Sequence, residues 1–235
     1  MLLFENPKSY AEMTKKISYT VFLFTMFGLF FVSQISSDFS DFMKDISFKM
    51  SAEVYGMKLY ISLLYIPIVI AILENVFSFH DKLSDLLGIR YRYDKNIVIR
   101  HYLQVLNMDK YIDKIDTKNR EIIMNEVFYK YASSTSPQID PHFIYLALGS
   151  WSWYWILLDT FSVTLFVGMF LLLKYYSLSA LIIIIIVLFS LYAFMFIKRN
   201  TDCIKYSTAE VDAILSYRPW KRKVTEYLRD ALQNK

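Results

Sequence analysis

The chain has 235 residues, 55% of them hydrophobic, and its mean hydropathy of +0.31 is too high for an ordinary soluble domain. Only five Gly and five Pro exclude collagen-like and low-complexity classes, and the single Cys203 excludes a disulfide scaffold and a cysteine-based zinc cluster. The net charge of +4 indicates no partner by itself. The composition predicts a membrane protein.

Four charge-poor runs predict four membrane-spanning helices, because a lipid-exposed backbone must satisfy its own hydrogen bonds. The first, residues 17–35, has no charged side chain and would be about 28 Å long as a helix, enough to cross a hydrocarbon core. The second covers about 57–77, and its central Pro67 predicts a kink. The third covers about 153–173 and the fourth about 175–197.

The remaining segments predict helices outside the membrane. Apolar residues recur at helical spacing over 94–107, and Thr117 is expected to cap a helix running to about residue 131. In the tail, Ser207 to Glu210 has the pattern of a capping box, and Trp220 starts another helix. The fold expected is all-α, with a transmembrane pair in 1–77, a ligand-sensing insert in 78–142, a second pair in 143–197, and a tail in 198–235 that packs on the insert into a small cytosolic domain.

The distribution of Lys and Arg predicts the orientation. Twenty-two of the 26 basic residues lie before the first span, in the insert or in the tail, and four lie in the other two connections. The positive-inside rule then places both termini and the insert in the cytoplasm. Trp151, Trp153 and Trp155 stand where the third span would enter the membrane, as an interfacial aromatic belt would.

Two acidic residues lie near the cytosolic ends of predicted spans, Glu74 in the second and Asp159 in the third. An ionisable group in a span usually faces a bundle interior or an aqueous cavity, and in a ring of subunits either acid could form an acidic pore mouth. The alternative is that they pair with basic residues or lie at the interface. Small residues on one face of spans one and three either allow close helix packing or line a pore; they include Thr25, Gly28, Thr160 and Thr164.

A basic and aromatic run follows the second span, and its candidate ligand-binding residues are Arg90, Tyr91, Arg92, Tyr93, Lys95, Arg100 and His101. Basic side chains neutralise phosphates and tyrosine rings stack on bases, a combination that suits a nucleotide or a short single-stranded oligonucleotide. The alternatives are attraction to anionic lipid and a solvated helix face.

Enzyme motifs are nearly absent from the sequence. The histidines His80, His101 and His142 show no metal-ligand spacing, and no glycine-rich phosphate loop or nucleophile elbow exists. His80 and Asp81 could form a catalytic pair, although a helix-terminal pair at a membrane surface is the simpler interpretation. We expect no enzyme activity, no cofactor and no metal.

The four-span layout, the Ile-, Tyr- and Lys-rich composition and the run Arg90–Tyr102 resemble the channel-forming membrane effectors of bacterial anti-phage systems, in particular the Hailong type. The resemblance covers the whole chain as topology and transfers no site residue. It implies an ion channel in the bacterial inner membrane whose opening depolarises the cell, held shut by an oligodeoxyadenylate signal that a partner nucleotidyltransferase makes. The layout is also similar to flagellar-stator-type proton channels, but span three lacks their Pro- and Gly-rich character.

Four helices from one chain close into a dry bundle, so a pore would need a homo-oligomer, a tetramer or similar ring, in the lipid bilayer. The function expected is an oligomeric ion channel gated by a nucleotide signal on its cytosolic domain, which causes cell death or growth arrest in anti-phage defence. The alternative is a non-enzymatic membrane scaffold or a subunit of a larger membrane complex.

Overall fold

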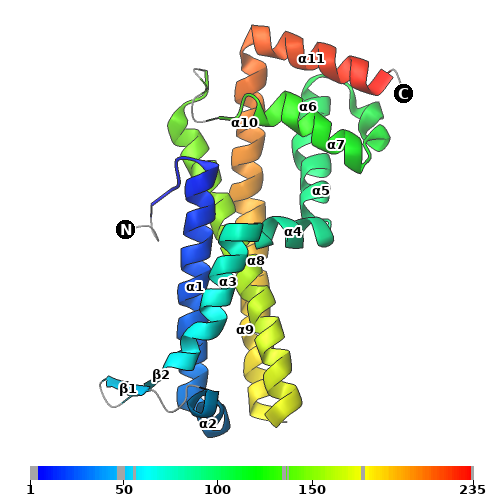
Figure 1. Ribbon diagram of the computed structural model, residues 1–235. Coiled ribbons are helices and arrows are strands. Elements are labelled where there is room, and N and C mark those ends of the chain that lie inside the picture. Colours follow the sequence, from blue (N-terminus) through cyan, green and yellow to red (C-terminus); the bar gives the residue numbers. More distant parts are fainter. Residues whose placement is uncertain are drawn as a thin grey trace. The chain divides into compact units, whose positions relative to one another are not determined.

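The computed structural model describes residues 5–46, 51–54, 57–133, 136, 138–175 and 178–233 (Figure 1). Apart from one short hairpin, the described chain is helical, which confirms the all-α class. The chain divides into two compact units. Unit 1 contains residues 1–4, 14–80 and 152–197, and unit 2 contains residues 5–13, 81–151 and 198–235.

Unit 1 holds most of the apolar helices. α1 (Tyr10–Ile35), α8 (Pro141–Tyr175) and the helix that begins as α9 (Leu178–Lys198) are long and apolar enough to cross a membrane. A fourth candidate is α3 (Tyr65–Phe77) with the preceding turn, together with α4 (Phe79–Leu86), bent by 79° at the break between them. These helices overlap the four predicted spans, although residues 176 and 177 of the fourth lie outside the described residues.

The predicted start of the second span is wrong. Residues 57–60 form strand β2 (Met57–Tyr60), which pairs antiparallel with β1 (Ser51–Val54) and is followed by the 3₁₀ turn η1 (Ile61–Leu64). Two residues separate the strands in the sequence, the spacing of a tight hairpin. Pro67 does not lie at a kink. It occupies the first turn of α3, where the missing N–H breaks no helical hydrogen bond.

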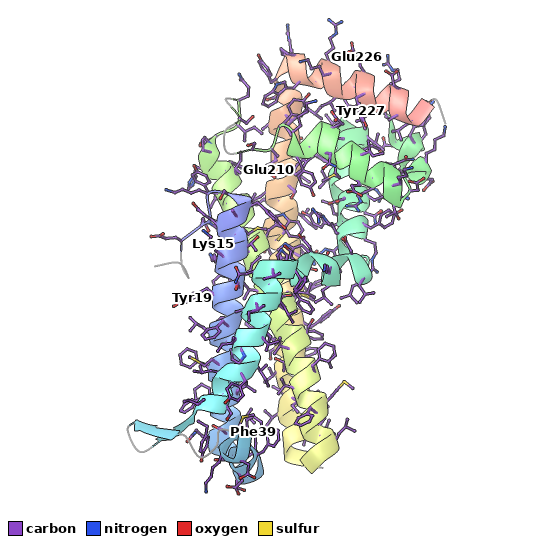
Figure 2. All side chains as sticks on the ribbon, viewed as in Figure 1. Lys15, Tyr19, Phe39, Glu210, Glu226 and Tyr227 are labelled. Atoms are coloured by element: carbon purple, nitrogen blue, oxygen red, sulfur yellow. The ribbon has the colours of Figure 1, made fainter. Side chains whose placement is uncertain are left out.

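A hydrophobic cluster joins α1, α2 (Ser37–Ile46), β2 and η1 within unit 1. Phe39, labelled in Figure 2, is buried there with Leu29, Met43, Tyr60 and Leu63. The hydroxyl of Ser62 donates to the Met43 carbonyl at 2.6 Å, which ties η1 to α2. The other face of α1 is exposed, and Figure 2 shows Lys15 and Tyr19 on it.

Unit 2 is built from short helices, three of them with π-helical hydrogen bonding. From the insert come most of α4, α5 (Ile89–Tyr93), the π segment 94–99, α6 (Arg100–Val105), the 3₁₀ turn 109–114, α7 (Thr117–Met124) and the π segment 125–129. From the tail come the π segment 199–203, α10 (Ile204–Ser216) and α11 (Arg218–Gln233). Insert and tail therefore share one compact helical unit.

Two predicted helix starts in unit 2 are wrong. α7 is capped by Asp116, whose side chain accepts the Asn119 N–H at 2.8 Å, and Thr117 is the first helical residue. Ser207 and Glu210 are buried inside α10, which continues from α9 through the π segment, so they form no capping box. Their apolar neighbours Val211 and Ile214 lie in the core, as do Ile99 and Leu103 from the insert.

Candidate functional site

A sharp turn between α3 and α4 places Glu74 and His80 against each other in unit 1. The chain leaves α3 through Ser78, a non-glycine residue in the left-handed region with φ of +47°, whose N–H donates to the Glu74 carbonyl at 3.1 Å. The chain bends by 79° between α3 and α4. His80 Nδ1 consequently lies 2.7 Å from Glu74 Oε2.

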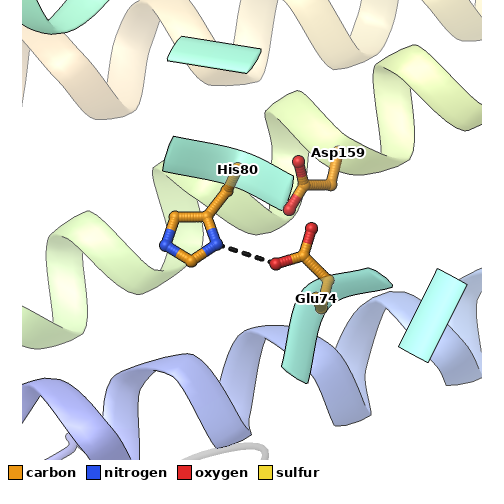
Figure 3. A group of neighbouring side chains, drawn as sticks. All are labelled: Glu74, His80 and Asp159. Atoms are coloured by element: carbon orange, nitrogen blue, oxygen red, sulfur yellow. Dashed lines mark hydrogen bonds and ion pairs between the residues drawn. The ribbon is translucent and has the colours of Figure 1, made fainter. Parts of the chain in front are cut away.

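Asp159 joins this pair from the middle of α8 (Figure 3). One ligand atom from each of Glu74, His80 and Asp159 lies within 4.8 Å of the other two, and all three side chains are fully buried. Trp155, one helical turn before Asp159, packs its ring 5.9 Å from the imidazole of His80. Two carboxylates and one imidazole thus converge inside a single chain.

Any charges on this triad, which consists of Glu74, His80 and Asp159, must be compensated. Two ionised carboxylates within 4.8 Å would repel each other by about 3 kcal/mol even at an effective dielectric constant near 20. His80 contacts one oxygen of Glu74; the other, Oε1, is buried and accepts no hydrogen bond from the part of the chain that the structure describes. Figure 3 shows that oxygen on the side of the Asp159 carboxylate. Such an arrangement suits protons or a cation held among the three side chains.

Polar contacts next to the triad join α1 to α3. Asn75, adjacent to Glu74, donates from Nδ2 to the Ser18 hydroxyl at 2.6 Å and to the Ala71 carbonyl at 2.8 Å. The Ser18 hydroxyl also lies 3.3 Å from the Ala71 carbonyl. Lys16 is buried on α1, with its ammonium 5.3 Å from the centre of the Trp153 ring on α8. α1 therefore contributes polar groups to the same helical unit as the triad.

The residues predicted from the sequence to line a pore lie in different surroundings in the structure. Glu74 and Asp159 meet inside one chain, whereas an acidic ring would need them on a surface shared by several chains. Thr25 is buried, and its hydroxyl has no hydrogen-bond partner among the described residues; the same is true of the Thr160 hydroxyl, next to Asp159. Gly28 is exposed with open space beside it, and Thr164 is half-buried.

The basic residues of the predicted ligand-binding run make contacts within unit 2. Arg90 pairs with Asp81 at 3.3 Å, so Asp81 lies in a different set of contacts from His80. Arg92 donates to the carbonyls of Leu87 and Gly88 at the end of α4. The Lys95 ammonium donates to the Ile115 carbonyl at 2.8 Å. These contacts stabilise the turns of the insert.

The aromatic residues of the run are largely structural. Tyr93 is only 3% exposed, meets the Trp151 ring edge-on at 4.5 Å, and donates its hydroxyl to Ser207 at 3.1 Å. The Tyr91 hydroxyl donates to the Ile115 carbonyl. His101 pairs with Asp212 of α10 at 2.8 Å. Of the seven predicted residues, Arg92 and Arg100 are the exposed ones.

The sequence suggested Asp81 as the partner of His80 and did not indicate its contact with Glu74. His80 follows Glu74 by six residues, a spacing that does not bring two side chains together on a straight helix. The contact depends on the left-handed turn at Ser78, and neither Ser78 nor its neighbours carry the glycine that usually marks such a turn. The proximity of Glu74 and Asp159 had a signal, since both stand near one end of a predicted span.

The fold and the triad define a helical membrane-type protein with ionisable groups buried among its apolar helices. Residues 9–230 match the YmfE protein family, a bacterial membrane-type family, and the chain belongs to it. No curated protein and no solved structure matches the chain.

Proposed function

We propose that this protein passes a cation across the bacterial membrane and that Glu74, His80 and Asp159 form a cation-binding site on the transport path. The observation that carries the proposal is the burial of two carboxylates and an imidazole in the apolar unit of the chain. Ionisable groups within membrane spans are costly to insert, and they usually mark ion or proton pathways. Because inserting three ionisable side chains among apolar helices is costly in free energy, the site fits a transport role better than a purely structural one.

The buried threonine hydroxyls of unit 1 support a polar route leading from the triad. Thr160 adjoins Asp159 on α8, and Thr25 lies farther along α1; neither hydroxyl has a hydrogen-bond partner among the described residues. Hydroxyls in this state can bind a water molecule or a passing cation. We propose that the route runs through the helices of one chain and that the chains assemble into a homo-oligomer.

Gating by a nucleotide signal is part of the same proposal. The exposed Arg92 and Arg100 could bind phosphate, although Tyr93 would have to leave the core of unit 2 before it could stack on a base. The role in anti-phage defence, the partner nucleotidyltransferase and the inner-membrane location with cytoplasmic termini also stay predictions. The scaffold alternative predicts a folded oligomer that passes no ions.

Cation flux through proteoliposomes tests the proposal. The purified chain is reconstituted, and entry of protons, K⁺ and Zn²⁺ is followed with entrapped dyes, with and without short oligodeoxyadenylate. We expect Glu74→Gln and Asp159→Asn each to lower the flux at least about tenfold, because each removes a carboxylate from the cation-binding site. The control is Asp41→Asn, which removes an exposed carboxylate from α2 in the same unit.

Flux that survives both triad substitutions would remove the triad from the route. A well-folded oligomer that passes no cation under any of these conditions would overturn the transport proposal and favour a scaffold.

A further inference from the structure

We infer that Glu74, His80 and Asp159 bind one divalent transition-metal ion of the Zn²⁺ class. The inference deepens the proposed function, on which it rests, because it names the ion that the cation-binding site holds. Three observations carry it: the donor set, the charge balance and an oxygen directed into the site.

The donor set is that of a transition-metal site. One imidazole nitrogen and two carboxylate oxygens lie within 4.8 Å of one another, and ligands around an ion with bonds of about 2.0–2.2 Å are separated by less than this. Imidazole favours Zn²⁺ and its neighbours over Mg²⁺ and Ca²⁺, which prefer oxygen ligands alone. Three protein ligands leave a coordination position open for water, as at sites where the ion or its ligand exchanges.

The charge balance selects a dication. As metal ligands the two carboxylates would be ionised and the imidazole neutral, so the three side chains would carry a charge of −2 in a fully buried place. A single divalent ion brings the site to neutrality, whereas K⁺ or Na⁺ would leave an uncompensated charge in a low-dielectric environment. A dication also removes the repulsion between the two acids.

The second oxygen of Glu74 provides an independent observation. Glu74 Oε1 is buried and accepts no hydrogen bond from any residue that the structure describes, and Figure 3 shows it facing the Asp159 carboxylate. A buried carboxylate oxygen without a donor is costly. A metal ion between Glu74 and Asp159 would satisfy that oxygen.

The local backbone supports the ligands as a metal site would require. Glu74 lies in the last turn of α3, His80 lies in the first turn of α4, and the N–H of Ser78 between the two helices donates to the Glu74 carbonyl. Trp155 packs against the His80 ring and limits its rotation. Two of the ligands are therefore placed by a rigid turn rather than by a long loop.

Binding of Co²⁺, a spectroscopic substitute for Zn²⁺, tests the inference in the full chain. Protein purified in detergent with its affinity tag removed is stripped with a chelator and titrated with Co²⁺, followed by visible absorption and by Zn²⁺ competition. We expect one Co²⁺ per chain, displaced by Zn²⁺. Glu74→Gln and Asp159→Asn should each weaken binding by at least about tenfold, and the exposed His142→Gln should bind as the wild type does.

A substitution that adds a new absorption band distinguishes loss of a metal ligand from misfolding of the variant. His80→Cys supplies a thiolate at the same position, so bound Co²⁺ should gain an intense near-ultraviolet band from sulfur-to-metal charge transfer. A folded His80→Cys chain that binds Co²⁺ without this band would overturn the inference, because His80 would then not be a ligand.

The outcomes separate the metal ion from the transport role. If the wild type binds neither Co²⁺ nor Zn²⁺, or if the triad variants bind as the wild type does, the metal inference fails. If the flux is nevertheless lost in Glu74→Gln, the proposed transport is retained, with protons as the cation bound at the site. Conversely, one bound metal ion per chain with no flux under any condition would confirm the site and overturn the transport.

Discussion

A second pair of buried charges lies in unit 2, between Asp94 and Arg120. Arg120 Nη1 donates to Asp94 Oδ2 at 2.8 Å, and both side chains are under 10% exposed. Burial raises the pKa of Asp94 from 3.8 to about 6, although its hydrogen bond and attraction to Arg120 act in the opposite direction. The pair joins the π segment 94–99 to α7, in the part of the chain where ligand binding was predicted from the sequence.

The pKa of Asp94 predicts a pH dependence of stability. Because its folded-state pKa lies above its ordinary value, the folded chain holds the proton more tightly between about pH 4 and pH 6. The contribution of this group is therefore complete below about pH 4 and is lost as the pH rises through about 6. Thermal unfolding followed by circular dichroism at several pH values checks this, and Asp94→Asn should remove that component.

The same variant should be no less stable than the wild type at pH 7, because the raised pKa means that the fold favours a neutral side chain at residue 94 and the amide is always neutral. The exposed Asp113→Asn serves as the control and should leave the profile unchanged. An Asp94→Asn chain that keeps the wild-type profile would assign the pH dependence to other groups.

Single residues show how far the sequence predicts the candidate site. Charge-poor runs with one acid each placed Glu74 and Asp159 near the cytosolic ends of spans, but the sequence predicted a pore mouth and not their contact within one chain. His80 could not be assigned, since its contact depends on the backbone angle at Ser78. Tyr93 was misleading, because an aromatic ring between arginines has the same sequence pattern whether it stacks on a base or fills a core.

At the scale of elements, helix existence was predictable and helix ends were not. α8 has 35 residues, about 52 Å as a helix, whereas a hydrocarbon core is about 30 Å thick. Hydropathy therefore located the span but not the start of the helix. Two tryptophans of the predicted aromatic belt also pack within the chain, since Trp151 meets Tyr93 within unit 2 and Trp155 meets His80 within unit 1. The π segments leave no mark in residue spacing at all.

Two helical glycines predict opposite effects of the same substitution. A Cβ at Gly168 would lie 2.9 Å from Ile184 Cγ2, so α8 and α9 approach each other closely there. We expect Gly168→Ala to lower stability by about 1 kcal/mol or more, because the helices must move apart. Gly28→Ala meets nothing within 4 Å and should raise stability by up to about 1 kcal/mol through helix propensity. Thermal unfolding in one detergent compares the two; equal signs would contradict this view of the α8–α9 contact.

At the scale of the whole molecule, the apolar surface is the main feature. α9 exposes large side chains on several sides, among them Ile182, Ile186, Phe189 and Phe194, and α3 exposes Val69 and Val76. Such a surface suits lipid or neighbouring chains. The charge distribution that predicts orientation is independent of this surface and can be tested separately.

The orientation can be tested by cysteine labelling, because the single natural cysteine, Cys203, is fully buried. A buried thiol reacts slowly, so the wild type serves as the blank. We expect Lys44→Cys on α2 to react with a membrane-impermeant maleimide added outside intact cells. Lys118→Cys on α7 should react only after permeabilisation, since the insert is predicted to be cytoplasmic. The reverse pattern would overturn the predicted orientation.

The turn at Ser78 also bears on how the protein enters the membrane during synthesis. Glu74 and His80 are six residues apart, so they can pair as soon as the first half of the chain has been made. Asp159 emerges some eighty residues later, and inserting its ionised carboxylate alone would cost up to about 3 kcal/mol, the value for the centre of a span. The early pair offers this late carboxylate a polar place to dock, whereas a chain without the turn would present α8 with no partner at that depth. Substitutions at Ser78 should therefore affect the yield of inserted protein as well as its activity.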